Sequence, residues 1–134
     1  MARSRGRFGP EWLLLVVTPL ALVLVGGWIW SFAPSSIAVS GSDVLIERNM
    51  AGDIRIPLET ARVRAVTEDD LRALRRTNGV SVGSLRFGQF SSDRLGRFEF
   101  YARRSGPLFV IQNGDRVVVV QPDDPSAFDK IRRP

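Results

Sequence analysis

Residues 108–120 read LFVIQNGDRVVVV, and this stretch sets the class of fold. Two apolar runs flank Asn113 and Gly114, and an Asn-Gly pair between apolar runs is the strongest short-range signal for a β-hairpin. Both arms are apolar on both of their faces, which is typical of strands that are buried on two sides. We therefore expect a mainly β domain with this hairpin at its centre or under a covering layer.

The residues after the hairpin, PDDPSAF at 122–128, carry the signals of a helix start. Asp124 is a favourable N-cap residue, because its side chain accepts a hydrogen bond from a free backbone N–H group of the first turn. Pro125 follows at the first helical position, where its missing N–H is no loss. Phe128 marks the buried side, so we expect a C-terminal helix that caps the sheets.

Upstream of the hairpin, short stretches alternate apolar and polar residues as half-buried strands do, at residues 37–46 with a turn at SGSD, 54–56, 61–65 and 98–102. Residues 67–78, TEDDLRALRRTN, change to a helical spacing, and Thr67 is a candidate cap for that helix. The sequence therefore predicts a bent antiparallel β-barrel or sandwich with a short mid-chain helix.

Two glycines within this β region need an explanation, because glycine weakens a strand interior. Gly79 stands just past the expected mid-chain helix, where a left-handed residue lets the chain leave. At Gly88 the alternation slips by one residue, since Leu85 and Phe87 share a face and the next large apolar residue is Phe90. We expect a β-bulge at Gly88.

Residues 12–32, WLLLVVTPLALVLVGGWIWSF, contain no charged residue. A helix of that length spans roughly 30 Å, the thickness of the hydrocarbon core of a bilayer. Trp12 lies at one end of it and Trp28 and Trp30 at the other, and indole rings favour the boundary between lipid and water. The sequence predicts a transmembrane helix, followed by a short polar linker at 33–36.

A cleaved signal peptide is the alternative interpretation of this segment. Ser36, Ile37 and Ala38 resemble a small-residue cleavage site, and cleavage there would release a secreted domain. Secretory apolar cores usually run about 7–15 residues, however, and this one is longer. We therefore favour a retained anchor and leave cleavage open.

The charges that flank the helix predict its orientation. Arg3, Arg5 and Arg7 precede the helix, whereas the residues that directly follow it carry no Lys or Arg. Basic flanks stay in the cytoplasm. We expect a single-pass protein of the cell membrane, with residues 1–11 as a cytoplasmic tail and residues 37–134 as an extracytoplasmic domain.

The chain has no histidine and no cysteine, which excludes imidazole base catalysis, Ser-His-Asp hydrolysis and thiolate zinc sites. The carboxylate pairs at 69–70 and 123–124 both fall at expected helix starts, where acidic residues satisfy free amides. We favour that role over acid–base or metal chemistry. We expect no catalytic residue, metal ion or cofactor.

Arginine supplies nearly all of the positive charge, since Lys130 is the only lysine. Residues 33–134 hold 16 Arg or Lys and 13 Asp or Glu, a net charge of +3. Candidate contacts for anionic lipid headgroups or an acidic partner lie on expected outer strand faces, at Arg62, Arg64, Arg86, Arg97 and Arg103, with Arg94 and Arg104 beside them. We favour the other interpretation, a solvated face whose arginines pair with acids such as Glu99 and Asp93, because a domain charge of +3 is modest.

Three segments resemble the bacterial PH-like (pleckstrin homology) domain family: GVSVGSLRFGQF at 79–90, GRFEFYARR at 96–104, and a closing helix start that matches Pro-Asp-x-Pro-x-x-Phe at 122–128. The resemblance implies two bent sheets that form a partly open barrel, with the last helix plugging one end. Many members are tethered by transmembrane helices. The first expected turn, SGSD at 40–43, lacks the basic residues of phosphoinositide-binding PH domains, so the resemblance carries no ligand site across.

We therefore expect a non-enzymatic interaction or assembly domain presented outside the membrane. Its expected partners are the bilayer and an unidentified protein, which includes a second copy of the chain, because PH-like sheets offer edge strands for peptide addition. Binding of the arginine-rich strand faces to anionic lipid is the alternative function. The predicted external location argues against nucleic acid, and no feature indicates a small-molecule substrate.

Overall fold

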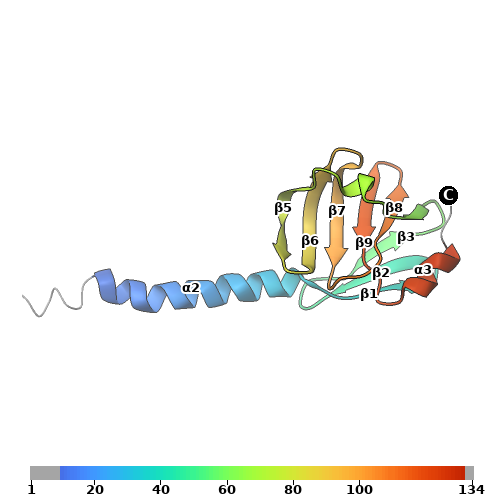
Figure 1. The fold of residues 1–134 in the computed structure, drawn as a ribbon. Helices are drawn as coiled ribbons and strands as arrows, with labels where there is room; N and C mark the ends of the chain where they lie inside the picture. Colours follow the sequence, from blue (N-terminus) through green and yellow to red (C-terminus); the bar gives the residue numbers. More distant parts are fainter. Residues whose placement is uncertain (1–9, 132–134) are drawn as a thin grey trace, which may run out of the picture.

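The computed structural model describes residues 10–131, which form a long helix and two packed β-sheets (Figure 1). The first sheet has three strands, β1 Pro34–Ser40, β2 Asp43–Arg48 and β3 Ile54–Pro57. The second sheet has six, in the spatial order β4 Arg62–Ala65, β8 Phe109–Asn113, β9 Arg116–Val120, β7 Gly96–Ala102, β6 Leu85–Ser92 and β5 Arg75–Val82. The helices are α2 Pro10–Phe32, the 3₁₀ helix η1 Asp69–Leu71 and α3 Pro125–Ile131.

The predicted mainly β fold, with a long apolar helix before it and a short helix after it, is confirmed. The three arginines on which the predicted orientation depends, Arg3, Arg5 and Arg7, lie outside the described residues.

The β8–β9 hairpin lies at the centre of the second sheet, and both faces of its arms are buried, as its apolar sequence predicts. Its turn is Gly114–Asp115, one position later than expected, because Asn113 still pairs with Arg116. Gly114 adopts the positive φ of +61° that this turn requires. Asn113 has a different role, since its Nδ2 donates a hydrogen bond to the carbonyl oxygen of Pro57 at 3.3 Å.

One strand pair departs from the predicted antiparallel arrangement, because β7 and β9 are parallel. β8 pairs with β4 on one side, and β9 turns back between β8 and β7. β9 therefore runs in the same direction as β7, and the register joins Glu99 to Val118 and Tyr101 to Val120.

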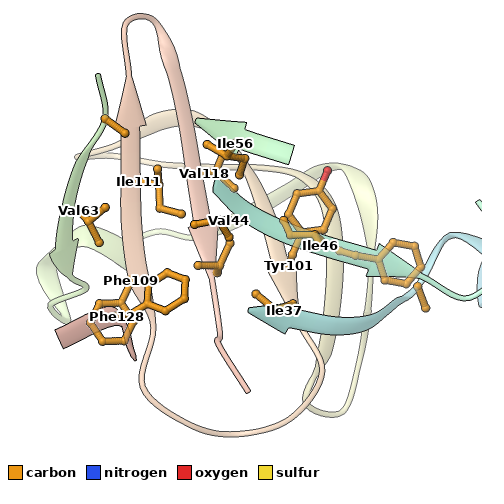
Figure 2. Packing of buried hydrophobic residues seen from close by; sticks show 14 residues of the cluster. Ile37, Val44, Ile46, Ile56, Val63, Tyr101, Phe109, Ile111, Val118 and Phe128 are labelled. Carbon is orange, nitrogen blue, oxygen red and sulfur yellow. The ribbon is translucent and has the colours of Figure 1, made fainter. Parts of the chain in front are cut away.

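The main hydrophobic core fills the space between the two sheets (Figure 2). The first sheet contributes Ile37, Val44, Ile46 and Ile56. The second sheet contributes Val63, Tyr101, Phe109, Ile111 and Val118. Because strand side chains alternate between two faces, each of these strands places every second residue in this core.

The C-terminal helix α3 closes one end of this core, as the sequence predicts. Pro125 is its first residue, and the backbone N–H of Ser126 donates a hydrogen bond to Asp124 Oδ1 at 3.1 Å. Phe128 is fully buried, and its ring centroid lies 5.3 Å from that of Phe109. The predicted cap, first residue and buried residue of the helix are therefore all found in place.

The predicted short mid-chain helix is present only as the three-residue 3₁₀ helix η1, and its expected last turn is not helical, because β5 already begins at Arg75. β4 and β5 lie at opposite edges of the second sheet, so residues 66–74 must cross five inter-strand spacings, roughly 24 Å. A nine-residue α-helix would reach only about 14 Å. This crossing segment (residues 66–74) also contains Ala73 with a left-handed φ of +58°, which a helix would not allow.

The crossing segment covers a second hydrophobic cluster, on the outer face of the second sheet. Val66, Leu71 and Leu74 pack against this cluster. Its aromatic part consists of neighbouring rings with centroids 5.2 to 6.5 Å apart, from Phe90, Phe98 and Phe100. The central strands of the second sheet are therefore buried on both faces, with one cluster on each, whereas the edge strand β5 is mostly exposed.

Gly79 and Gly88 face each other across β5 and β6, so the predicted helix exit at Gly79 and bulge at Gly88 are both wrong. A Cβ atom on Gly88 would lie 2.6 Å from the Cα of Gly79, so the two glycines permit a close approach of the strands. The register shift lies on β5 at Thr77, while β6 pairs with β7 without interruption. Phe87 and Phe90 are buried in different clusters on the two sides of the sheet, so the alternation does not slip.

Candidate functional site

The helix α2 is apolar over almost its whole length. Glu11–Phe32 is long and apolar enough to cross a membrane, and a helix of this kind near the N-terminus is either a membrane span or a signal sequence. The predicted interface anchors Trp12, Trp28 and Trp30 are 50%, 64% and 56% exposed. These side chains are therefore free to contact lipid.

The helix enters the β domain without a linker. The predicted polar linker at 33–36 is wrong, because β1 starts at Pro34 and Ala33 is only 4% exposed. Hydrogen bonds from the β2–β3 loop reach the end of the helix: Asn49 N to Ala33 O at 3.1 Å, Asn49 Nδ2 to Trp30 O at 2.8 Å, and Met50 N and Ala51 N to Ser31 O at 3.0 Å each. The last carbonyl groups of a helix have no partners within it, and here the loop satisfies them. This helix–domain joint holds α2 and the domain together as one unit.

The joint fixes which side of the domain is turned toward α2. Figure 1 shows α2 leaving the domain on the β5 side of the second sheet, with β8 on the far side. The β5 edge, the β5–β6 turn and the β2–β3 loop therefore lie toward the helix. We call this the helix-side surface and define it by Met50, Arg75, Arg76 and Val82.

The helix-side surface carries exposed apolar side chains. Outside α2, the large apolar residues that are exposed in the described part of the chain are Met50, at 75%, and Val82, at 66%. Met50 belongs to the loop that binds the helix end, and Val82 is the last residue of β5. The exposed apolar residues of the domain therefore lie next to the apolar helix.

A groove of about 280 Å³ opens between the end of α2 and the β5–β6 pair, lined by Trp28, Ile29, Phe32, Arg48, Asn78, Gly79, Val80, Phe87, Gly88 and Tyr101. Burial raises the pKa of the Tyr101 hydroxyl, and the charge of Glu99, which accepts its hydrogen bond at 3.1 Å, raises the pKa further. Tyr101 is therefore a neutral hydrogen-bond donor. No carboxylate lines this groove, so its described residues offer no general base near neutral pH.

Two of the five arginines that the sequence singles out are bound to carboxylates. Arg64 of β4 donates to Asp70 at 2.6 and 2.9 Å, and Arg103 donates to Asp123 at 3.2 Å. The acids that were alternative partners have bound other arginines: Glu99 pairs with Arg116 at 2.7 Å, and Asp93 with Arg75 at 3.8 Å. The paired arginines hold the fold together and are less available to a ligand.

The other three arginines lie apart from one another. Arg62 is exposed on β4, Arg97 is exposed at the start of β7, and Arg86 is half-buried on β6. Among the described residues, none of them lies within 4.0 Å of a carboxylate. Arg86 instead shares a pocket with Arg104 from the β7–β8 loop. The predicted set therefore does not form a single basic surface.

Asp70 has a role that the sequence did not indicate, because only helix capping was predicted for it. It is fully buried and accepts hydrogen bonds from Arg64 and from the Thr67 N–H at 2.8 Å. The hydrogen bond from Arg64 lowers the pKa of Asp70 well below its usual range, assisted by Thr67 and opposed by burial. Ser92 Oγ donates to the Asp70 carbonyl oxygen at 2.6 Å. Asp70 therefore ties β4, the crossing segment and β6 together.

The described acidic residues do not gather in groups of three or more that could hold a metal ion.

Comparison with known proteins identifies a family for the β domain. A family model described as a bacterial PH domain matches residues 36–133, a range that takes in both sheets and α3 but not α2. Neither the comparison with curated proteins nor the comparison with solved structures gives a match.

Proposed function

Because the chain belongs to the bacterial PH domain family, we propose that it is a non-enzymatic PH domain anchored by α2 and resting on the outer surface of the bilayer. The observation that carries this proposal is the helix–domain joint. Its hydrogen bonds fix the domain to the helix, so the direction of the helix decides which surface of the domain meets the lipid.

Retention of α2 is supported by the position of the alternative cleavage site. Residues 36–38 lie inside β1, and Ile37 is fully buried in the main core. Its N–H donates to Asp123 Oδ2 at 3.2 Å, and its carbonyl oxygen accepts from the Asp123 N–H at 2.9 Å. Cleavage there would remove the first part of a core strand. We therefore favour an anchored protein over a secreted domain.

The arginines at the N-terminus support an orientation in which the tail is cytoplasmic and the PH domain lies outside. In that orientation the helix-side surface faces the outer leaflet. Met50 and Val82 then provide apolar contacts, and full burial of such side chains is worth roughly 1.5–3 kcal/mol each. Arg76 adds attraction to anionic headgroups, about 1 kcal/mol near such a surface, whereas Arg75 already pairs with Asp93 at 3.8 Å and contributes less.

The same geometry bears on strand addition, the predicted mode of protein contact. β5 is an eight-residue edge strand, and an open edge of this kind is where a partner peptide usually adds. In an anchored chain this edge faces the bilayer, which leaves little room for a partner strand. Contact with lipid is therefore the function that this edge supports best. Binding of a protein partner or of a second copy stays a prediction for surfaces that face away.

Fluorescent labels at single cysteines test the lipid contact, because the natural chain has no cysteine. The full chain would be reconstituted in vesicles with an environment-sensitive dye on M50C, V82C or, as a control, D115C in the exposed β8–β9 turn. We expect blue-shifted emission and quenching by lipids brominated in their upper acyl chains for M50C and V82C. The control should be quenched only by aqueous iodide.

A fourth label on L20C within α2 separates the anchor from the surface contact. Lipid quenching of L20C together with iodide quenching of M50C and V82C would keep the anchor and refute the surface contact. Loss of the L20C label together with the N-terminal mass, with iodide quenching of the other three labels, would show cleavage and refute the anchor as well.

A further inference from the structure

A pocket of about 250 Å³ lies on the outer face of the second sheet, between the β5–β6 turn and the β7–β8 loop. We call it the arginine pocket, and it is lined by Gly83, Ser84, Arg86, Phe100, Ala102, Arg104, Ser105, Gly106 and Leu108. It is separate from the groove beside α2, with which it shares no residue.

The charge of the arginine pocket is not balanced. Arg86 and Arg104 both line it, and no acidic residue does. Within the described chain neither arginine has a carboxylate within 4.0 Å, whereas Arg64, Arg103 and Arg116 are each paired. Two cations that share one concave site repel each other, and an anion between them removes that cost.

The arginine side chain from β6 is held in place before any ligand arrives. The guanidinium carbon of Arg86 lies 5.8 Å from the ring centroid of Phe100, which is fully buried. This cation–π contact orients the planar group without using its hydrogen-bond donors. A pre-oriented donor loses less entropy when it binds a ligand.

The loop that carries Arg104 is fixed as well. The backbone N–H groups of Arg103 and Arg104 each lie 3.4 Å from Gln121 Oε1, and Gln121 is only 4% exposed. Ser105 Oγ lies 3.1 Å from Ser84 Oγ, so the two rims of the pocket touch. One of these two hydroxyl groups donates to the other, so the pair leaves one free hydroxyl donor beside the two guanidinium groups.

We propose that the arginine pocket binds a phosphate group, carried by a phosphate monoester. Two guanidinium groups and one free hydroxyl donor match a doubly charged tetrahedral oxyanion better than a carboxylate, which offers only two oxygens. The pocket is wider than a phosphate group alone, so the rest of the ester has space at its mouth. The site is argued from its own residues and does not depend on the proposed membrane contact.

Isothermal titration of the full-length protein in neutral detergent tests the proposal, with inorganic phosphate and glycerol 3-phosphate as probes. Replacement of an arginine by glutamine removes charge-assisted hydrogen bonds, so R104Q and R86Q should each weaken binding about tenfold or more. R97Q is the matched control, because Arg97 is exposed and without an ion pair in the described chain, and its affinity should equal that of the wild type. Arg104 is exposed, so the R104Q protein should fold normally. This variant therefore tests the pocket even if R86Q disturbs the packing of Phe100.

Mixed micelles that contain phosphatidic acid distinguish the two sources of the phosphate group. Competition between this lipid and glycerol 3-phosphate in the wild type, lost in R104Q, would support the pocket and assign it to lipid headgroups. Binding of glycerol 3-phosphate without competition would support the pocket and assign it to soluble esters. No binding of either probe by the wild type, or equal binding by wild type and R104Q, would overturn the proposal.

Discussion

Replacement of Gly88 by alanine should destabilise the domain by more than the strain of its positive φ alone, because the new side chain would also clash with β5. The new Cβ atom would lie 2.6 Å from the Cα of Gly79 and 2.8 Å from the carbonyl oxygen of Asn78. Both are backbone atoms of β5, so neither moves away by a side-chain rotation. The strands must separate, or β5 must leave its register. Gly88 also has a φ of +110°, which strains any other residue.

Gly41 provides the matched control. It has a φ of +62° in the β1–β2 turn, and an added Cβ would meet nothing within 4 Å. G41A should therefore lose only the stability that the strained backbone of an alanine at this φ costs, about 1–2 kcal/mol. G88A should lose at least as much stability, because a φ of +110° lies outside the left-handed region that alanine can adopt, and in addition roughly 1–3 kcal/mol for forcing an extra carbon into a packed site.

Thermal unfolding of the full chain in detergent, followed by the circular dichroism of the β-sheets, measures the difference. In a domain of about 100 residues each kcal/mol lowers the Tm by roughly 4–8 °C, so G88A should melt at least about 4 °C below G41A. Equal melting temperatures for the two variants would refute the close approach of β5 and β6 as the reason for the glycine pair.

Two further substitutions test the interior. D70N removes the buried carboxylate and should lower the stability at neutral pH by about 2 kcal/mol, less than for a fully buried pair because Arg64 is 41% exposed. The pKa of Asp70 is lowered in the folded state, so its contribution to the stability is present above the unfolded pKa and is lost as the pH falls below about 4. Urea titrations should therefore show a smaller loss of stability with acid in D70N than in the wild type. F128A should cost roughly 3–5 kcal/mol because Phe128 is fully buried, whereas K130A on the same helix should change stability by less than about 0.5 kcal/mol in the same titrations.

The elements that the sequence predicted correctly are those with local signals. The Asn-Gly hairpin, the Asp124–Pro125 helix start and the apolar run of α2 each depend on residues that are close together in the chain. The mid-chain helix is shorter than its local spacing predicted, because a requirement set by distant strands overrules that spacing. Residues 66–74 must reach from one edge of the sheet to the other, and a helix is too short to do so.

The predicted bulge at Gly88 was wrong, and the pocket shared by Arg86 and Arg104 was missed, for a related reason. Alternation predicts faces only when one face is exposed, and β6 is buried on both, so Phe87 and Phe90 gave the false impression of a slip. Sequence analysis singled out Arg86 as a candidate contact, but its proximity to Arg104 depends on two loops that meet in space. No local pattern contains that information.

The helix–domain joint changes how strong the membrane contacts need to be. A domain on a flexible tether could turn any side toward the lipid, and its contacts would have to offset the orientational entropy that is lost on docking. Here the hydrogen bonds from the β2–β3 loop fix the orientation when the domain folds. In the proposed anchored protein the helix would also keep this surface next to the bilayer, which has the same effect as a high local concentration of lipid. In the proposed orientation, two apolar side chains such as Met50 and Val82 would then be sufficient to keep the domain on the membrane.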